Sequence, residues 1–268
     1  MKKYLYGFKL YFLNSFTYRF NTVINLLFGN VRLLIVIFFW GLIYGGDMQK
    51  PLNGFTLSGM ITYLVFMDIF SSLIYGLRNS GLIYSGMIKG GSLGPALLKP
   101  QSLSMSVYFR NLSGGITGRL PQVLLAICVI PFMAQFFVWD INMVNTAFIL
   151  VFLLVGTVST HLVCSFLGYM AFWLEESTSV MWSFMVILNV LTGFFLPLDF
   201  FPECSTKFLE LLPFSSWGYI QAKIYIGLYS LEKQTYLLFI QLIWIGALLL
   251  LNAFIWRKGV KKYSSVGG

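Results

Sequence analysis

The sequence predicts an all-α polytopic membrane protein, and two observations support that prediction. Hydrophobic residues make up 58% of the 268 residues and charged residues only 10%, whereas soluble domains carry about 25% charged residues. The mean hydropathy is accordingly high, at +0.80. Apolar runs of about 20 residues also recur, which is the length that a helix needs to cross a membrane. The short alternating strands typical of a membrane barrel are not found.

Six apolar segments are long enough to be transmembrane helices within one membrane domain over residues 1–268. A cytoplasmic section at residues 78–115 and an outer section at residues 197–234 connect some of them. We predict the spans at residues 22–44, 57–77, 116–138, 144–174, 179–197 and 235–256.

Residues 1–20 are predicted to form a basic amphipathic helix that lies in the membrane interface. Leu5, Phe8, Phe12 and Phe16 recur at helical spacing among Lys and Arg residues. A cleaved signal peptide is the less favoured alternative, because several polar residues interrupt the apolar segment and no cleavage pattern of small residues follows.

The positive charges indicate the orientation of the chain. With both termini in the cytoplasm, thirteen Lys and Arg residues lie inside: four before the first span, five between the second and third, and four after the last. Four lie outside, and Arg32 within the first span completes the eighteen. This asymmetry follows the positive-inside rule. The net charge of +9 therefore reflects topology in a cytoplasmic membrane, and we exclude nucleic acid as a partner.

The cytoplasmic section contains a short helix clamped between residues that break helices. Gly90 and Gly91 end the preceding helical pattern, Ser92 can cap a new helix, and Pro95 falls in its first turn. Pro100 then ends it. We predict that this helix docks on a partner protein, and the alternative is an ordinary surface helix. The assigned docking residues are Ile83, Met87, Leu93, Leu97, Leu98 and Lys99.

The outer section is too long for a turn and too apolar for a free loop. We predict that it dips back into the membrane as a re-entrant gate, with two short helices that satisfy its backbone hydrogen bonds. A loop that lies on the membrane surface is the alternative. The residues assigned to this gate are Pro197, Asp199, Pro202, Leu212 and Phe214.

Polar residues within the predicted spans are candidates for an ion pathway, namely Arg32, Asp68 and His161. Ionisable residues inside a membrane are often functional, but each can equally pair or pack within a helix bundle. A secondary transporter or channel built on these residues is the main competing interpretation, although they are few and scattered. Gly41 and Gly45 have the small-xxx-small spacing of a helix contact, which we assign to a dimer.

The sequence contains no complete motif for catalysis, and we predict that the chain is not an enzyme. Ser92 and Leu93 follow glycines with the spacing of a phosphate-binding loop, but that loop needs Lys and then Ser or Thr there. His161 is the only histidine and no second ligand follows it at zinc-site spacing. The glutamate pair at residues 175–176 resembles that of membrane-embedded prenyl-protein proteases, but Val180 stands where they carry arginine. We predict no metal and no cofactor in this chain.

Three stretches resemble one known family. GGSLGPALLKP, at residues 90–100, is similar to its inner-loop signature. GFFLPLDFFP at 193–202, followed by LLPFSSW at 211–217, resembles its outer segment before the last span. WRKGVKKYSSVGG at 256–268 resembles its closing basic tail. In this order and spacing, the chain is similar to the permease subunits of type-two ABC exporters, in the bacterial six-span subfamily.

The resemblance implies a permease that exports a substrate using ATP hydrolysed by separate partners. It implies two permeases, identical or related, in a lipid bilayer and bound to two ABC ATPases, which would hold the ATP and Mg. The short inner helix would be the coupling helix. Gln221 and Lys223 depart from the apolar run that the family pattern leads us to expect. Aromatic-rich spans with few charges favour an amphipathic drug, peptide or lipid-like cargo.

Overall fold

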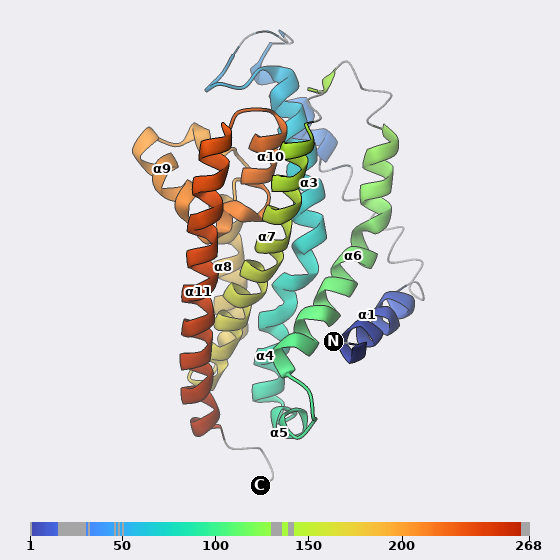
Figure 1. The fold of residues 1–268 in the computed structure, drawn as a ribbon, viewed down its shortest axis with the longest axis vertical. Coiled ribbons are helices and arrows are strands. Elements are labelled where there is room, and N and C mark those ends of the chain that lie inside the picture. The colour runs from blue at the N-terminus through green and yellow to red at the C-terminus, as the bar shows by residue number, and fades with distance from the viewer. Residues whose placement is uncertain are drawn as a thin grey trace.

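The computed structural model describes residues 2–15, 31, 33–45, 47, 49, 51–129, 136–138 and 142–263. Over these residues the chain is a bundle of helices (Figure 1), and the one extended pairing among them is an isolated bridge between Leu52 and Phe55. The predicted all-α polytopic membrane fold is confirmed.

The helices vary widely in length. An apolar helix at Leu33–Ile43 lies between α1 and α3. The labelled elements are α1 (Lys2–Ser15), α3 (Leu57–Ile74), the 3₁₀ helix η1 (Tyr75–Asn79), α4 (Ser80–Lys89), α5 (Leu93–Leu97), α6 (Leu103–Val129), α7 (Met143–Tyr169), η3 (Met170–Phe172), α8 (Ser177–Leu191), η4 (Leu198–Phe200), α9 (Glu203–Leu211), η5 (Pro213–Trp217), α10 (Tyr219–Tyr225) and α11 (Leu231–Lys262).

Three continuous helical stretches are long and apolar enough to cross a membrane. They are Leu57–Lys89, Met143–Phe172 and Leu231–Lys262, which correspond to α3–η1–α4, α7–η3 and α11. Leu33–Ile43 and Ser177–Leu191 are shorter apolar helices. The described part of the chain therefore contains three membrane-length helices, compared with the six spans that the sequence predicts.

The helix that begins at Leu57 is longer than its predicted span. Thr56 caps its first turn, because the threonine hydroxyl accepts a hydrogen bond from the Gly59 N–H at 3.2 Å. The helix does not end where the prediction ended it but continues through η1 and α4 to Lys89. No residue in between needs a left-handed backbone, and the first that adopts one is Gly91, with φ of +71°.

Other helices also start or end away from their predicted limits. α6 begins earlier, at Leu103, and α11 begins at Leu231, directly after Ser230 caps it. α8 ends earlier, at Leu191, and Gly193 then turns the chain with φ of +74°. The reason is common to all three: a helix stops at a cap or a left-handed residue, and not where hydropathy falls.

Helix α7 packs against α4, α10, α11 and η5, and glycines allow the closest of these contacts. A Cβ atom on Gly81 of α4 would lie 2.6 Å from the Cys164 carbonyl oxygen, and one on Gly168 would lie 2.5 Å from the Gly81 carbonyl oxygen. On the other side, a Cβ on Gly76 would lie 2.2 Å from the Asn111 carbonyl oxygen of α6. These glycines therefore hold η1 and α4 tightly between α6 and α7.

Helix α1 lies against α6 (Figure 1). Tyr4 stacks on Phe109 with ring centroids 6.0 Å apart, and the Ser113 hydroxyl donates a hydrogen bond to the Phe8 carbonyl oxygen at 3.0 Å. The two described residues of the predicted apolar face, Phe8 and Phe12, are half-buried, and other apolar residues of this helix are exposed. The exposed apolar residues are Tyr6, Leu10, Tyr11 and Leu13.

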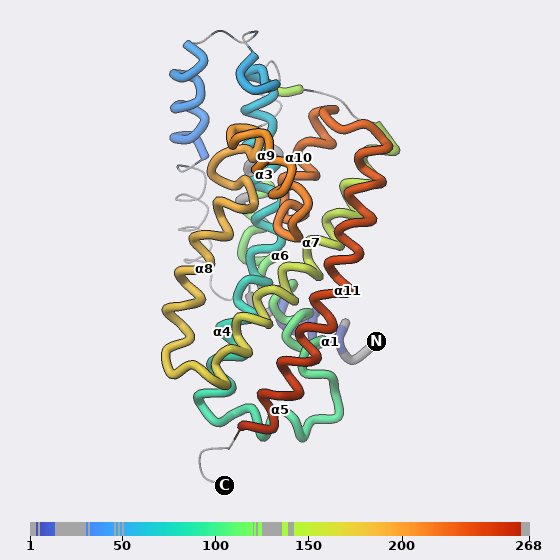
Figure 2. Tube along the Cα trace, turned by 90° about the vertical axis from the view of Figure 1, so that its left-hand side faces the viewer, coloured from blue at the N-terminus to red at the C-terminus, as the bar shows by residue number. Residues whose placement is uncertain are grey.

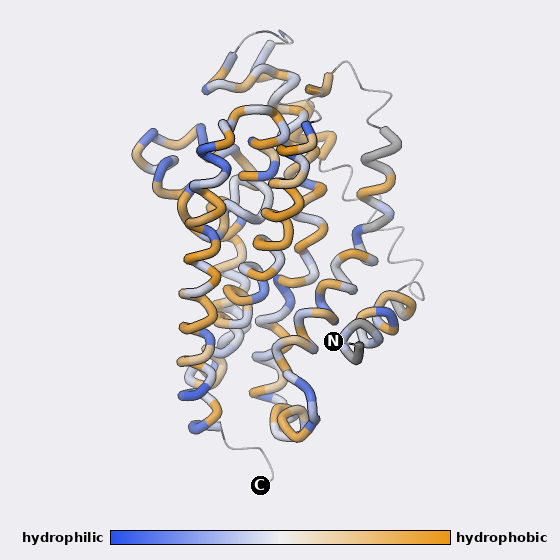
Figure 3. Tube along the Cα trace, in the orientation of Figure 1, coloured by the Kyte–Doolittle hydropathy of each residue, from blue (hydrophilic) through white to orange (hydrophobic). Residues whose placement is uncertain are grey.

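The bundle has two distinct ends, which we name by the helices they carry (Figure 1). The α5 end holds α5 and the last turns of α11, and the α9 end holds α9. Hydrophilic residues gather in the loop beside α5 and in the last turns of α11, whereas the middle of α11 is apolar (Figure 3). Leu33–Ile43 and α8 both lie along the edge of the molecule opposite α11 (Figure 2).

Candidate functional site

The clamped motif forms a short helix, α5, at the α5 end of the bundle. Gly91 turns the chain out of α4 with φ of +71°, and Pro95 lies within α5. Leu98 is 87% exposed and Leu97 is 42% exposed, and Lys99 is exposed beside them. We call these three residues, Leu97, Leu98 and Lys99, the α5 tip.

Leu93 does not belong to this exposed surface, which corrects its assignment as a docking residue. Its side chain is fully buried in a cluster with Tyr84, Val107 and Tyr169, because the first residue of α5 faces the bundle. A buried side chain cannot bind a partner, so Leu93 anchors α5 instead. Two further assigned residues are half-buried and pack against the same cluster: Ile83 and Met87.

Four short helices fill the outer section, where the sequence predicted two. Pro197 comes directly before η4 and Pro202 directly before α9. η5 and α10 pack against α3 and α7, and the buried Trp217 donates its ring N–H to the Ser159 hydroxyl at 2.9 Å. The outer section is therefore folded onto the bundle. The two other apolar residues assigned to the gate, both half-buried, are Leu212 and Phe214.

Asp199 lies at the centre of a polar cluster in this section. Its carboxylate accepts hydrogen bonds from Lys223 Nζ at 2.6 Å and from the Tyr219 hydroxyl at 3.0 Å. Gln221 donates to the Ser216 carbonyl oxygen at 2.7 Å. The two polar residues that depart from the expected apolar run, Gln221 and Lys223, thus have partners within the outer section. Asp199 joins η4 to α10.

A second buried carboxylate, Glu210, joins the outer section to the last long helix. It lies in α9 and accepts hydrogen bonds from the Tyr229 hydroxyl and from Lys233 Nζ, which stands in the first turn of α11. Two carboxylates therefore hold the outer section in place. Asp199 links two of its own helices, and Glu210 links it to α11.

Among the polar residues proposed for an ion pathway, His161 has hydrogen-bond partners on two other helices. His161 of α7 has its Nδ1 atom 2.9 Å from the Ser80 hydroxyl and its Nε2 atom 3.1 Å from the Ser104 hydroxyl. Asp68 is buried in α3, and Arg32 lies outside the described residues. The position of His161 suits a polar contact that holds α4, α6 and α7 together.

Gly41 and Gly45 have different surroundings, although their spacing suggested one role. A Cβ on Gly41 would meet no atom within 4 Å, so this part of the helix is open in the single chain. Gly45 lies beyond the helix end with φ of +64°, and its N–H bonds to the Leu42 carbonyl oxygen at 3.0 Å. The left-handed turn explains this glycine. Gly41 remains the candidate for close approach of another helix.

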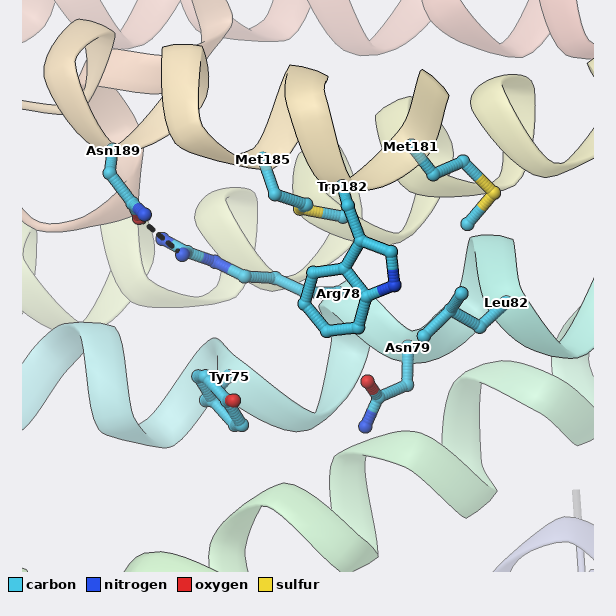
Figure 4. A pocket seen from close by; sticks show the side chains of 8 residues that line it. All are labelled: Tyr75, Arg78, Asn79, Leu82, Met181, Trp182, Met185 and Asn189. Atoms are coloured by element: carbon cyan, nitrogen blue, oxygen red, sulfur yellow. Dashed lines mark hydrogen bonds between the residues drawn. The ribbon is translucent and has the colours of Figure 1, made fainter. Parts of the chain in front are cut away.

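The sequence did not point to Arg78, which lies in a polar site inside the bundle. Arg78 lies in η1, and the helix continues through it into the predicted cytoplasmic section. Its Nη1 atom donates to Asn189 Oδ1 at 2.7 Å, and its guanidinium lies 5.6 Å from the centroid of the Trp217 ring. Arg78 and Asn189 border a cavity of about 140 Å³ between the η1–α4 segment and α8 (Figure 4). One signal in the sequence could have indicated that the helix continues through Arg78: no proline lies between Leu57 and Lys89.

The long apolar helices and the cavity inside the bundle define a polytopic membrane protein of the class that includes transport subunits. In the described part of the chain, no group of three His, Cys, Asp or Glu residues could hold a metal ion. The chain matches the ABC-2 family transporter protein model over residues 31–267, and it belongs to that family. No curated protein matches it. The chain is thus the membrane-embedded permease component of an ABC transporter, which works with an ABC ATPase.

Proposed function

We propose that this permease exports an amphipathic drug, peptide or lipid-like substrate across the cytoplasmic membrane of a bacterium. Two partner ABC ATPases would bind ATP and Mg and would hydrolyse the ATP, and this chain would bind neither. The observation that carries the proposal is the α5 tip, because exposed apolar residues on an anchored helix are suited to binding another protein.

The charges at the α5 end support its assignment to the cytoplasmic side. Lys89 ends α4, and Lys99 belongs to the α5 tip. The last turns of α11 lie at the same end and carry Arg257, Lys258, Lys261 and Lys262. Basic residues collect on the cytoplasmic side of membrane proteins, so the ATPases would meet the α5 tip there.

Leu98→Asp is expected to release the ATPase from the permease. Burying a leucine side chain contributes about 1.5–3 kcal/mol, so its loss should lower the amount of co-purified ATPase by about tenfold or more. Because Leu98 is 87% exposed, the variant should still fold in membranes. The measurements are co-purification of the two subunits and the ATP hydrolysis rate of the purified complex.

Phe208→Asp is the matched control for this experiment. Phe208 lies on α9, at the opposite end of the bundle, and is 63% exposed. It should retain the ATPase at the wild-type level. If Leu98→Asp also retained the ATPase and its hydrolysis rate, the α5 tip would not be the docking site.

We also propose that two permeases, identical or related, pair along the edge that contains Leu33–Ile43 and α8. Within the described chain α8 buries only Ser177, Met181 and Leu188, so most of its surface has no partner in this chain. Phe38 and Val186 are 64% and 63% exposed on this edge. A pair arranged in this way would place the cavity beside Arg78 close to the shared interface.

Cysteine cross-linking tests this arrangement. In a chain without its native cysteines, Phe38→Cys or Val186→Cys should form a disulfide between two permeases in membranes. Leu250→Cys is the control, since Leu250 is 75% exposed on α11, at the opposite edge. Cross-linking at Leu250 alone would contradict the proposed pair.

We propose that the outer section closes the far end of the transport path. The packing of its η5 and α10 helices on α3 and α7 supports this proposal. The ion pairs at Asp199 and Glu210 would hold this closed arrangement, and their rearrangement would open it.

A further inference from the structure

A cavity of about 140 Å³ lies beside Arg78, between two walls that come from different parts of the chain (Figure 4). The α8 wall carries the apolar side chains Met181, Trp182 and Met185, together with Asn189. The opposite wall comes from η1 and α4 and includes Tyr75, Asn79 and Leu82. Thioether side chains adapt their shape to different apolar partners. The cavity therefore joins one cationic group to an adaptable apolar surface.

Two of the three nitrogen atoms of the Arg78 guanidinium have no hydrogen-bond partner. Nη1 donates to Asn189 Oδ1, while Nε and Nη2 are buried and unpaired among the described residues. Leaving buried donors unpaired costs free energy, so such groups in a native protein need an explanation. A ligand that accepts hydrogen bonds from both nitrogen atoms would supply that explanation.

The unpaired atoms are the two whose N–H groups point in the same direction. Nε–H and one Nη2–H lie along a single edge of the planar guanidinium, and that edge matches two oxygens of a carboxylate or phosphate. The bond to Asn189 uses the remaining nitrogen, so this buried edge has no hydrogen-bond partner among the described residues. The geometry selects a planar or tetrahedral oxyanion over a neutral hydroxyl group.

The charges near the cavity also favour an anion. The three ion pairs formed within the described residues involve Lys207, Lys223 and Lys233, and none involves Arg78. The buried guanidinium of Arg78 therefore brings a positive charge to the cavity, and a negative group is the ligand that such a charge attracts.

We propose that Arg78 binds the phosphate or carboxylate head group of an amphiphile, whose apolar chain lies along α8. The inference rests on the proposed function in one respect, because only a transport function would make this amphiphile the transported substrate. A cavity of this size is ample for an oxyanion, and the α8 wall would then contact the first carbons of the chain.

Binding of radiolabelled dodecyl phosphate to the purified permease, in neutral maltoside detergent, tests the site. Arg78→Gln should weaken this binding by about tenfold or more, because it removes a charged bidentate partner. Arg78→Lys keeps the charge but loses the two-pronged edge, and it should bind with intermediate affinity. Arg257→Gln, which removes an exposed arginine from α11, should change binding less than about twofold. Equal binding by Arg78→Gln and the wild type would overturn the proposal.

Competitors distinguish the chemistry of the ligand. Unlabelled dodecanoate should displace dodecyl phosphate, whereas dodecanol at the same concentration should not. Inorganic phosphate should compete only weakly, since it makes no contact with the α8 wall. If inorganic phosphate displaced the radiolabelled ligand as effectively as unlabelled dodecyl phosphate does, the ligand would not be an amphiphile.

A second variant keeps the test decisive if Arg78→Gln fails to fold. Met185→Trp leaves Arg78 in place and adds bulk at a half-buried position of the α8 wall, so it should also block binding. Wild-type affinity in a folded Met185→Trp variant would argue against this cavity.

The transport part of the inference is tested separately with the ATPase bound. Dodecyl phosphate should stimulate ATP hydrolysis by the wild-type complex, and Arg78→Gln should abolish the stimulation. Stimulation that survives in Arg78→Gln would show that the site is not on the transport path. If no ATPase joins the wild-type permease, the proposed function fails, and the binding result stands by itself.

Discussion

Gly81→Ala is expected to destabilise the permease strongly, because it adds one methyl group at the closest crossing of α4 and α7. That Cβ would lie 2.6 Å from the Cys164 carbonyl oxygen and 2.7 Å from Met181 Cε. The methionine can move, but the helix backbone cannot move without separating α4 from α7. Overpacking of this kind costs about 1–3 kcal/mol, and a backbone clash belongs at the upper end. Thermal unfolding in detergent measures the loss.

Gly86→Ala is the control within the same helix. A Cβ on Gly86 would meet no atom within 4 Å, and Gly86 is exposed. Alanine in the interior of a helix is favoured over glycine by about 0.5–1 kcal/mol, so this variant should be as stable as the wild type or slightly more so. Equal stability of Gly81→Ala and Gly86→Ala would show that the α4–α7 contact is looser than the structure indicates.

Asp199→Ala is expected to unfold the outer section, because it leaves Lys223 buried without its anion. The Lys223 and Asp199 side chains are only 10% and 19% exposed, and the Tyr219 hydroxyl loses an acceptor as well. Removing one partner of a buried ion pair costs about 3–5 kcal/mol. Unfolding in detergent and proteolysis between Pro197 and Lys223 should both report the change.

Two controls separate this effect from a general loss of charge. Glu203→Ala breaks another carboxylate–lysine pair in the same section, but the Glu203 and Lys207 side chains are 84% and 73% exposed. It should have little effect, since exposed ion pairs contribute little to stability. Asp199→Leu combined with Lys223→Met should recover part of the lost stability, because the pair is then removed as a whole. A destabilisation by Glu203→Ala as large as that by Asp199→Ala would contradict this explanation.

Composition and local breakers predicted much of this protein. The fold class follows from hydropathy, and the short helix after Gly91 follows from glycine and proline positions, although the Ser92 side chain makes no capping hydrogen bond. These are local signals, and each depends on residues close together in the chain. The family resemblance, which the family model confirms over residues 31–267, also depends on short local stretches.

The parts that the sequence did not predict depend on distant neighbours. Leu93 resembles Leu98 in the sequence, yet one is fully buried and the other is 87% exposed, because only Leu93 faces the bundle. Hydropathy falls at Arg78, but the helix continues through this residue, and its partner Asn189 lies far away in the sequence. The partner of Lys223 is Asp199, which lies twenty-four positions earlier in the chain. No local pattern shows which of these residues meet.

The buried position of Leu93 has a mechanical consequence. If the docking residue lay on a flexible loop, force from a bound ATPase would bend only that loop. Leu93 instead lies in the same cluster as Tyr84, Tyr169 and Trp256, which belong to α4, α7 and α11. The Tyr169 and Trp256 rings are 4.9 Å apart between centroids. We therefore expect the α5 tip to be stiff, so that force applied by an ATPase at Leu98 strains several long helices at once.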